Sequence, residues 1–276
     1  ISRHPLQLRF SMKWAPRASV VRLAAIGTVS LAAGLAARAG AEKSEVVQGE
    51  CGTVSGAEVC TWGEMTGGTL ASFGATIPAG AFENAPDDME MVWPPVANAI
   101  LTLPEQVRTA TGLQTLTVYW EAHGHPPGPY LTPHFDFHFY GMSRDEIAGI
   151  DCADASKPAE LPATYELPDV DIPGLGMLPG LCVPSMGMHS LPAEELHGTD
   201  LFEKTMIVGY YRAAPIFVEP MITRATLMQK QSFAMAVPAV PGQPAGTRYP
   251  TSFRADYDST AQAYRFVFSD FTPGTE

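Results

Sequence analysis

Positive charge is scarce over most of this sequence. All 29 aspartates and glutamates follow Ala41, but only 11 of the 17 lysines and arginines do, so residues 42–276 carry a formal charge of −18. A surface with this excess of negative charge repels phosphate backbones. We therefore expect no nucleic-acid partner.

The sequence also lacks an apolar run long enough for a membrane span. Its longest run, Leu23 to Ala37, is shorter than the roughly 20 residues that a span requires and is interrupted by glycine. A basic stretch from Met12 precedes the run, and the small residues Ala39-Gly40-Ala41 follow it. This pattern is typical of a cleaved secretory signal, with residues 1–11 as an upstream extension. We expect a periplasmic or secreted protein with no stable membrane insertion after cleavage.

Cysteine is limited to Cys51, Cys60, Cys152 and Cys182, none of them in CxxC spacing. In an oxidising compartment an even number favours disulfides, and the local pairs Cys51–Cys60 and Cys152–Cys182 are the simplest of three connectivities. A thiolate metal site is the less favoured interpretation. A Gly-x-Ser-x-Gly elbow is also missing, which argues against serine-nucleophile catalysis.

Glycine and proline are abundant, with 25 residues each, and they separate short runs of alternating apolar residues. Such punctuation is typical of strands joined by turns. Strands are expected over 58–62, 69–73, 205–211 and 216–223, with a hairpin over 248–270 and helical turns near 104–107 and 225–231. Residues 157–191 are expected to be a long connection. The fold class is all-β, an antiparallel barrel or sandwich with few short helices, in a single domain over 42–276.

The clearest chemical feature is a histidine-rich hairpin at 115–140. Successive strand residues point to opposite faces, so Leu116, Val118 and Trp120 share one face with Phe135, Phe137 and Phe139 when both strands pack on one core. The opposite face then carries the polar side chains Glu121, His123, His125, His134, Asp136 and His138. Neighbours across strands lie about 5 Å apart, so several imidazoles can converge on one ion.

Imidazoles with a nearby carboxylate suit a divalent metal, with zinc favoured over copper or iron. Two groups further along the chain can complete the site. Glu219 interrupts an apolar strand, where a buried carboxylate requires a cation or a donor, and an exposed edge carboxylate is the alternative. His189 follows Met186 and Met188; methionine beside imidazole suits Cu(I), but packing is the favoured role for these methionines. His197 follows two glutamates and is expected on the surface.

Several of these segments resemble a family of uncharacterised secreted proteins, classed as a domain of unknown function. The motifs that carry the resemblance are Pro133-His-Phe-Asp-Phe-His-Phe-Tyr140 and Glu219-Pro-Met-Ile-Thr223. The resemblance implies an all-β secreted domain that can form homo-oligomers, and it brings no established activity. Cupins and α-type carbonic anhydrases also place His-x-His on a strand. However, Pro126-Pro127-Gly128 stands where the cupin glutamate would be, and the third histidine of the anhydrases lies on a more distant strand.

Three hypotheses of function follow. The first is a metal-dependent hydrolase or lyase in which His134 and His138 are the first ligands of one ion and His123 or His125 is the third. His189 is a further candidate ligand, and Glu219, Asp136 or Glu121 is the base. The second is a non-catalytic periplasmic protein that binds or buffers zinc or copper, and the third is a histidine network that only rigidifies a hairpin. An open three-ligand site beside a pocket favours catalysis, whereas a closed four-ligand site favours binding.

Overall fold

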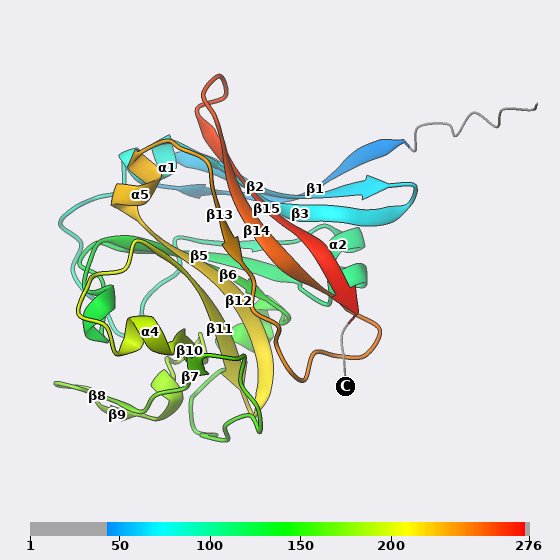
Figure 1. Cartoon of the computed structure of the whole chain (residues 1–276). Helices are drawn as coiled ribbons and strands as arrows, with labels where there is room; N and C mark the ends of the chain where they lie inside the picture. Colours follow the sequence, from blue (N-terminus) through cyan, green and yellow to red (C-terminus); the bar gives the residue numbers. More distant parts are fainter. Residues whose placement is uncertain (1–42, 274–276) are drawn as a thin grey trace, which may run out of the picture. The chain divides into compact units, whose positions relative to one another are not determined.

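Two antiparallel sheets pack face to face in the computed structural model, which describes residues 43–273 (Figure 1). The described residues belong to one compact unit. The expected signal segment and upstream extension, residues 1–41, lie outside the described residues. Neither large sheet closes on itself within the described chain, so of the two architectures expected from the sequence the sandwich fits better than the barrel.

The first sheet has six strands in the order β1-β2-β3-β15-β14-β13. These strands are β1 (Ser44–Val54), β2 (Ala57–Thr66), β3 (Thr69–Pro78), β13 (Phe233–Ala236), β14 (Arg248–Asp258) and β15 (Ala263–Pro273). The expected hairpin over 248–270 is confirmed as the pair β14 and β15, which turns after Asp258.

The second sheet has seven strands in the order β4-β5-β6-β12-β11-β10-β7. These are β4 (Ala99–Thr102), β5 (Thr115–Glu121), β6 (His134–Tyr140), β7 (Tyr165–Glu166), β10 (Met188–Pro192), β11 (Lys204–Tyr211) and β12 (Ala214–Thr223). A separate hairpin joins β8 (Val170–Ile172) to β9 (Gly176–Leu178). The expected connection over 157–191 thus contains short strands, which are too brief to give a periodic pattern.

Helices are few and short, as expected. They are α1 (Gly80–Glu83), α2 (Glu105–Thr111), η1 (Gly128–Tyr130), α3 (Arg144–Ala148), η2 (Pro179–Leu181), α4 (Ala193–Leu196) and α5 (Arg224–Met228). Pro104 precedes the first residue of α2, and the Thr223 side chain accepts a hydrogen bond from the backbone N–H of Thr226 at the start of α5. Within the described residues, no helix is long and apolar enough to span a bilayer.

The core between the two sheets is built largely from phenylalanine. Phe137 and Phe139 of β6 meet Phe266 and Phe268 of β15, with ring centroids 4.9 Å apart for Phe137–Phe266 and 5.0 Å for Phe139–Phe268. These side chains are fully buried. The inward face of β6 is therefore fixed by apolar packing, and its polar residues must point away from the six-stranded sheet.

Both expected disulfides are present. Cys51–Cys60 links β1 to β2, and Cys152–Cys182 ties the chain after α3 to the residue that follows η2. All four cysteines are thus bonded, and a thiolate metal site is excluded for them. The second disulfide fixes the long connection beneath the seven-stranded sheet.

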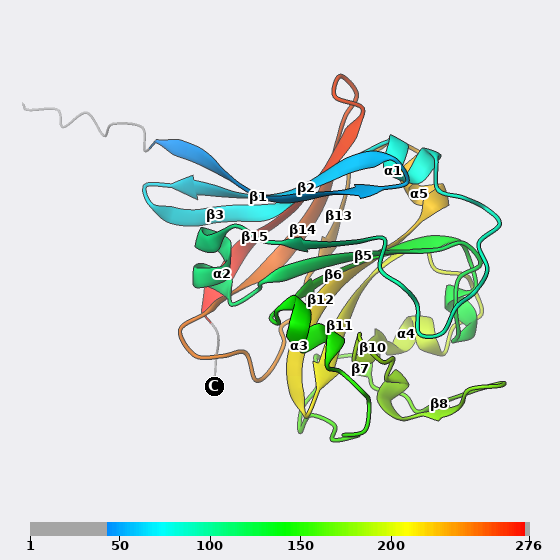
Figure 2. The same cartoon turned by 180° about the vertical axis from the view of Figure 1, so that it is seen from behind.

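Segments from two distant parts of the sequence cover the polar face of the seven-stranded sheet. One is the chain between α1 and β4, which Figure 2 shows running down the edge of this sheet toward the side where β8 lies. The other is the β8–β9 hairpin with the chain that leads to β10. Both segments contribute walls to one pocket on this face.

Candidate metal centre

Strand β6 places three polar side chains on the face of the sheet opposite the phenylalanine core. It pairs with β5 on one side, where Glu121 is opposite His134 and Thr117 is opposite His138, and with β12 on the other. His134 and His138 are fully buried, and Asp136 is nearly so. The alternation expected from the sequence is confirmed for β6, and it puts titratable groups inside the protein.

The first group of candidate ligands, which we call triad B, consists of His138, His189 and Glu219. The Nε2 atom of His138 lies 3.4 Å from Glu219 Oε2 and 3.5 Å from His189 Nε2. One ligand atom from each of the three residues lies within 4.8 Å of the other two. All three side chains are buried. Two imidazoles and one carboxylate form a ligand set used by catalytic zinc and by non-haem iron(II).

The strand order explains how residues so distant in sequence meet at triad B. Strand β12 pairs with β6, which brings Glu219 beside His138. Strand β11 pairs with β12, and β10 pairs with β11 so that His189 is opposite Gly209. Gly209 has no side chain, and the Phe217 ring lies within 2.1 Å of where the Cβ of a larger residue would be, so only glycine leaves room for this packing.

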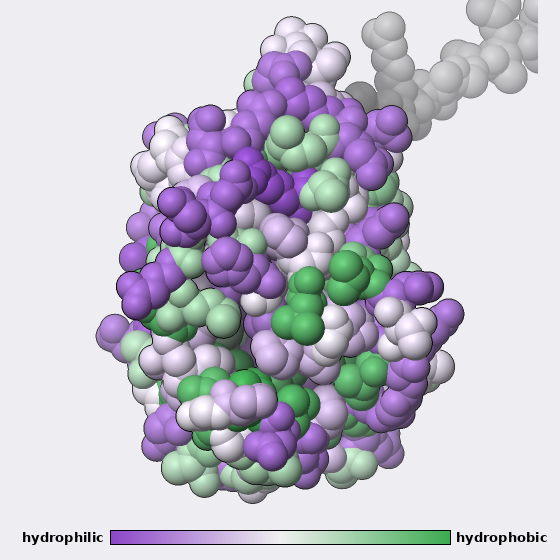
Figure 3. All heavy atoms as spheres, turned by 90° about the vertical axis from the view of Figure 1, so that its left-hand side faces the viewer, coloured by the Kyte–Doolittle hydropathy of each residue, from purple (hydrophilic) through white to green (hydrophobic). Residues whose placement is uncertain are grey.

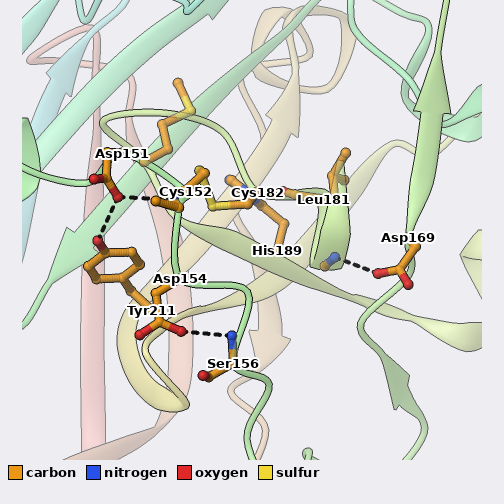
Figure 4. The surroundings of a disulfide bond; sticks show 12 residues. Asp151, Cys152, Asp154, Ser156, Asp169, Leu181, Cys182, His189 and Tyr211 are labelled. Carbon is orange, nitrogen blue, oxygen red and sulfur yellow. Dashed lines mark hydrogen bonds between the residues drawn. A yellow bond between two sulfur atoms is a disulfide. The ribbon is translucent and has the colours of Figure 1, made fainter. Parts of the chain in front are cut away.

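Hydrogen bonds prepare His189 to act as a ligand through Nε2. Its Nδ1 lies 3.1 Å from the carbonyl oxygen of Leu181, so Nδ1–H donates and the Nε2 lone pair faces the triad. Leu181 precedes Cys182, and Figure 4 shows the disulfide beside the His189 ring. The disulfide thus anchors the carbonyl that orients His189.

Two polar atoms of triad B, His138 Nδ1 and Glu219 Oε2, make no hydrogen bond among the described residues, although Glu219 Oε2 lies within ion-pair distance of His138 Nε2. Burial raises the pKa of Glu219 well above its usual value, and the nearby charges of Asp136 and Glu121 raise it further. Burial lowers the pKa of His138 to about 3 and that of His189 to about 4. Both imidazoles are therefore neutral at pH 7, which is the form that binds a metal.

A second group, which we call triad A, consists of His125, His134 and Asp136. The His134 Nε2 atom lies 3.2 Å from Asp136 Oδ1, and His125 Nε2 lies 3.8 Å from Asp136 Oδ2. Each histidine directs Nδ1 at a backbone carbonyl, His134 at Thr132 (2.6 Å) and His125 at Pro126 (2.9 Å). Both Nε2 atoms therefore face the Asp136 carboxylate. A nitrogen lone pair and a carboxylate oxygen repel each other, so a proton or a cation must lie between them.

The charges of triad A differ from those of triad B. Burial raises the pKa of Asp136, but the two histidines outweigh burial and hold it well below the usual range. Burial lowers the pKa of His125, while the hydrogen bond and charge of Asp136 raise it more, to about 9. Because 34% of the His125 side chain is exposed, water weakens this ion pair. Triad A can thus be an imidazolium–carboxylate pair or a second metal site.

The remaining expected site residues lie outside both triads. The sequence predicted His123 and His125 on the strand, but this prediction is wrong. Strand β5 ends at Glu121, and both histidines lie in the connecting loop. Gly124 enforces the break: its φ is +66°, and a Cβ there would lie 2.2 Å from the Tyr130 carbonyl oxygen. His123 is exposed and contacts only the Met89 carbonyl oxygen among hydrogen-bond partners in the described chain.

Glu121 remains close to the site although it belongs to neither triad. It is half-buried at the end of β5 and lines the same pocket as Asp136 and Glu219. Burial raises the pKa of Glu121 to about 7, with a further increase from Asp136. A carboxyl group with this pKa can accept or donate a proton near neutral pH.

The methionines beside His189 have packing roles. Met188 is fully buried in the core between the sheets, and Met186 packs against Tyr119 and Val183. His197 is exposed and lies 3.0 Å from Glu166, which agrees with the expected surface position.

A pocket of about 390 Å³ opens onto both triads. His125 and Asp136 of triad A and His189 and Glu219 of triad B line it, whereas His134 and His138 lie behind these residues. A volume of this size is typical of small-molecule sites. Sequence reasoning missed the segment 89–96 as a wall of this pocket, and the only signal was its run of apolar residues without a strand or helix pattern.

Comparison with protein-family models, with curated proteins and with solved structures finds no match for this chain.

Proposed function

We propose that this protein is an exported metalloenzyme that holds a divalent ion, zinc in the first place, at triad B and catalyses a hydrolase or lyase reaction. The observation that carries the proposal is the convergence, beside a pocket, of two neutral imidazoles and a buried carboxyl group whose Oε2 makes no hydrogen bond among the described residues. A buried carboxylate without a donor is costly, and a cation is the partner that relieves this cost.

The residues around triad B take distinct roles in this proposal. His138, His189 and Glu219 hold the ion, and three protein ligands leave a position open toward the pocket, as in catalytic zinc sites. When bound, the ion supplies Lewis acidity and lowers the pKa of water in its open position. Glu121, with a pKa of about 7, is the base that accepts a proton at its carboxylate. Asp136 is less suited to that task because its oxygens face His134 and His125, which hold its pKa well below the usual range.

A specific observation favours a second candidate function, the binding or buffering of zinc or copper without catalysis. Triad A has the same composition as triad B and lies on the same face of the sheet. Two loaded triads would give the protein a capacity of two ions per chain. If the protein turns over a substrate and this turnover is lost when Glu121 is replaced, the protein is an enzyme and does not only store metal.

The proposal is tested by measuring zinc in the oxidised, full-length protein after export and dialysis. His189→Ala and Glu219→Gln should each weaken zinc binding by at least ~100-fold in competition with a chromophoric chelator, because loss of a direct ligand costs more than the 10–100-fold typical of outer-shell partners. His123→Ala and His197→Ala are matched controls, since both histidines are exposed and outside the triads.

The same titration tests triad A. His125→Ala and Asp136→Asn should remove a second ion and leave the first in place. Zinc affinity that is unchanged in every triad B variant would contradict the proposed function.

A further inference from the structure

The walls of the pocket are mainly apolar, although its floor carries the two triads. Met91, Val92 and Val96 come from the segment between α1 and β4, and Leu175 comes from the β8–β9 hairpin. We call these four side chains the apolar rim. Deeper in the pocket, the walls are formed by buried side chains such as Met186. A molecule that reaches triad B must pass between these surfaces.

The apolar rim is unusually open to water. Met91 is 70% exposed and Val96 is 74% exposed, and Val92 and Leu175 are also exposed. Figure 3 shows apolar side chains gathered on the face that lies at the left in Figure 1. Clustered apolar exposure around a pocket is characteristic of a ligand-binding surface, because burial against an apolar ligand removes this area from water.

The charges of the pocket disfavour an anionic ligand. Glu90, Glu121, Asp136 and Glu219 line it, whereas no lysine or arginine of the described chain does. Even with a doubly charged ion in each triad, four ionised carboxylates leave the pocket without net positive charge. A phosphate or carboxylate group would therefore find no lysine or arginine to bind it, and the His125 imidazolium already faces Asp136.

From these observations we propose that the pocket binds an uncharged, mainly apolar small molecule whose polar head, a carbonyl or hydroxyl oxygen, faces triad B. The apolar body is held by the rim and the deeper walls. The part of the proposal that concerns the head rests on the proposed function, because it requires the ion at triad B. The part that concerns the body is independent of the metal.

The test compares probes that share a head or a tail, using calorimetry on the zinc-loaded and the metal-free full-length protein. Octanohydroxamic acid should bind the zinc-loaded protein at least ~50-fold more tightly than acetohydroxamic acid, since each buried methylene adds about fourfold. On the zinc-loaded protein, octyl phosphate, with a tail of similar length and an anionic head, should bind at least tenfold more weakly than octanamide, whose head is uncharged. Octanamide should bind the metal-free protein more tightly than acetamide does.

Paired substitutions locate the binding surface. Met91→Asp should weaken octanohydroxamic acid at least tenfold and leave acetohydroxamic acid unchanged, because it places a charge in the apolar rim. Met228→Asp is the matched control, since Met228 is 45% exposed and does not line the pocket.

The outcomes distinguish this inference from the proposed function. If zinc binds but the two hydroxamic acids bind equally, the apolar ligand class is overturned while the metal site stands. If zinc does not bind but octanamide does, the proposed contact between the polar head and triad B is overturned. The proposed binding of an apolar body in the pocket then still holds. Equal effects of Met91→Asp and Met228→Asp, or uptake of several octanohydroxamic acid molecules per chain, would overturn the assignment to this pocket.

Discussion

Glu219 is the residue whose position most constrains what this protein does. It is 1% exposed in a strand that is otherwise apolar from Ile216 to Ile222, and burial, followed by the charges of Asp136 and Glu121, raises its pKa. Ionising a carboxyl group in such a place is costly unless it gains a partner. In the proposed function, an ion at triad B is that partner.

The raised pKa of Glu219 gives the metal-free protein a distinct pH dependence. The folded state retains a proton on Glu219 above pH 4.5, where the unfolded chain has lost it, so the free energy of unfolding falls as pH rises. The neutral His138 and His189 act in the opposite direction only below about pH 6.5. Above about pH 6.5 we therefore expect the free energy of unfolding to fall with rising pH for as long as Glu219 keeps its proton, by up to about 1.4 kcal/mol per unit for one proton.

Glu219→Gln should reduce this slope, because glutamine does not titrate. Chemical denaturation of the metal-free protein at several pH values measures the effect. His125 also loses its stabilising charge as pH rises through about 9, so part of the slope should remain in the variant. An identical slope in wild type and Glu219→Gln would show that Glu219 is already ionised at pH 7.

At the scale of single elements, the alternation along β6 could be predicted from the sequence. Phe135, Phe137 and Phe139 require one face of the strand to be apolar, and His134, Asp136 and His138 then must share the other face. The grouping into two triads could not be predicted, because it depends on which strands neighbour β6. The partners His189 and Glu219 reach His138 only through the order β6-β12-β11-β10.

The end of β5 could not be predicted from the sequence either. The alternation of side chains extended the strand to His123 and His125, but the backbone at Gly124 turns the chain. His125 still reaches Asp136 from the loop, whereas His123 turns toward Met89. Local backbone geometry, rather than periodicity, decides which of the two histidines joins a triad.

The connection that carries η2 links the Cys152–Cys182 disulfide to triad B. The Leu181 carbonyl accepts the hydrogen bond from His189, and Cys182 is the next residue. Replacing Cys152 and Cys182 by serine should lower zinc affinity by about 10–100-fold, as expected for loss of an orienting partner. Loss of a cross-link between residues 30 positions apart should also cost about 3.7 kcal/mol of stability.

The Cys51–Cys60 disulfide is the matched control for this experiment. It joins residues nine positions apart in the six-stranded sheet, away from both triads. Replacing both of its cysteines by serine should cost about 2.7 kcal/mol and leave zinc affinity unchanged. Chelator competition below the unfolding transition measures both variants, and equal zinc affinities in the two would contradict a role of the Cys152–Cys182 disulfide in orienting His189.

At the scale of the whole molecule, the apolar core and the candidate site lie on opposite faces of the seven-stranded sheet. One face of the seven-stranded sheet packs on the phenylalanine core, and the opposite face supports the triads beneath loop segments. The two disulfides agree with the export expected from the sequence. This arrangement allows polar groups to be buried at the site while the core between the sheets remains apolar.

Anomalous diffraction at the zinc edge, from crystals of the zinc-loaded protein, would locate the ion directly. We expect an anomalous peak about 2.0–2.2 Å from His138 Nε2, His189 Nε2 and a Glu219 carboxylate oxygen, with the open side toward the pocket. A weaker peak between His125, His134 and Asp136 would correspond to a second ion. Zinc located only at exposed residues such as His123 or His197, with triad B unoccupied, would contradict the account.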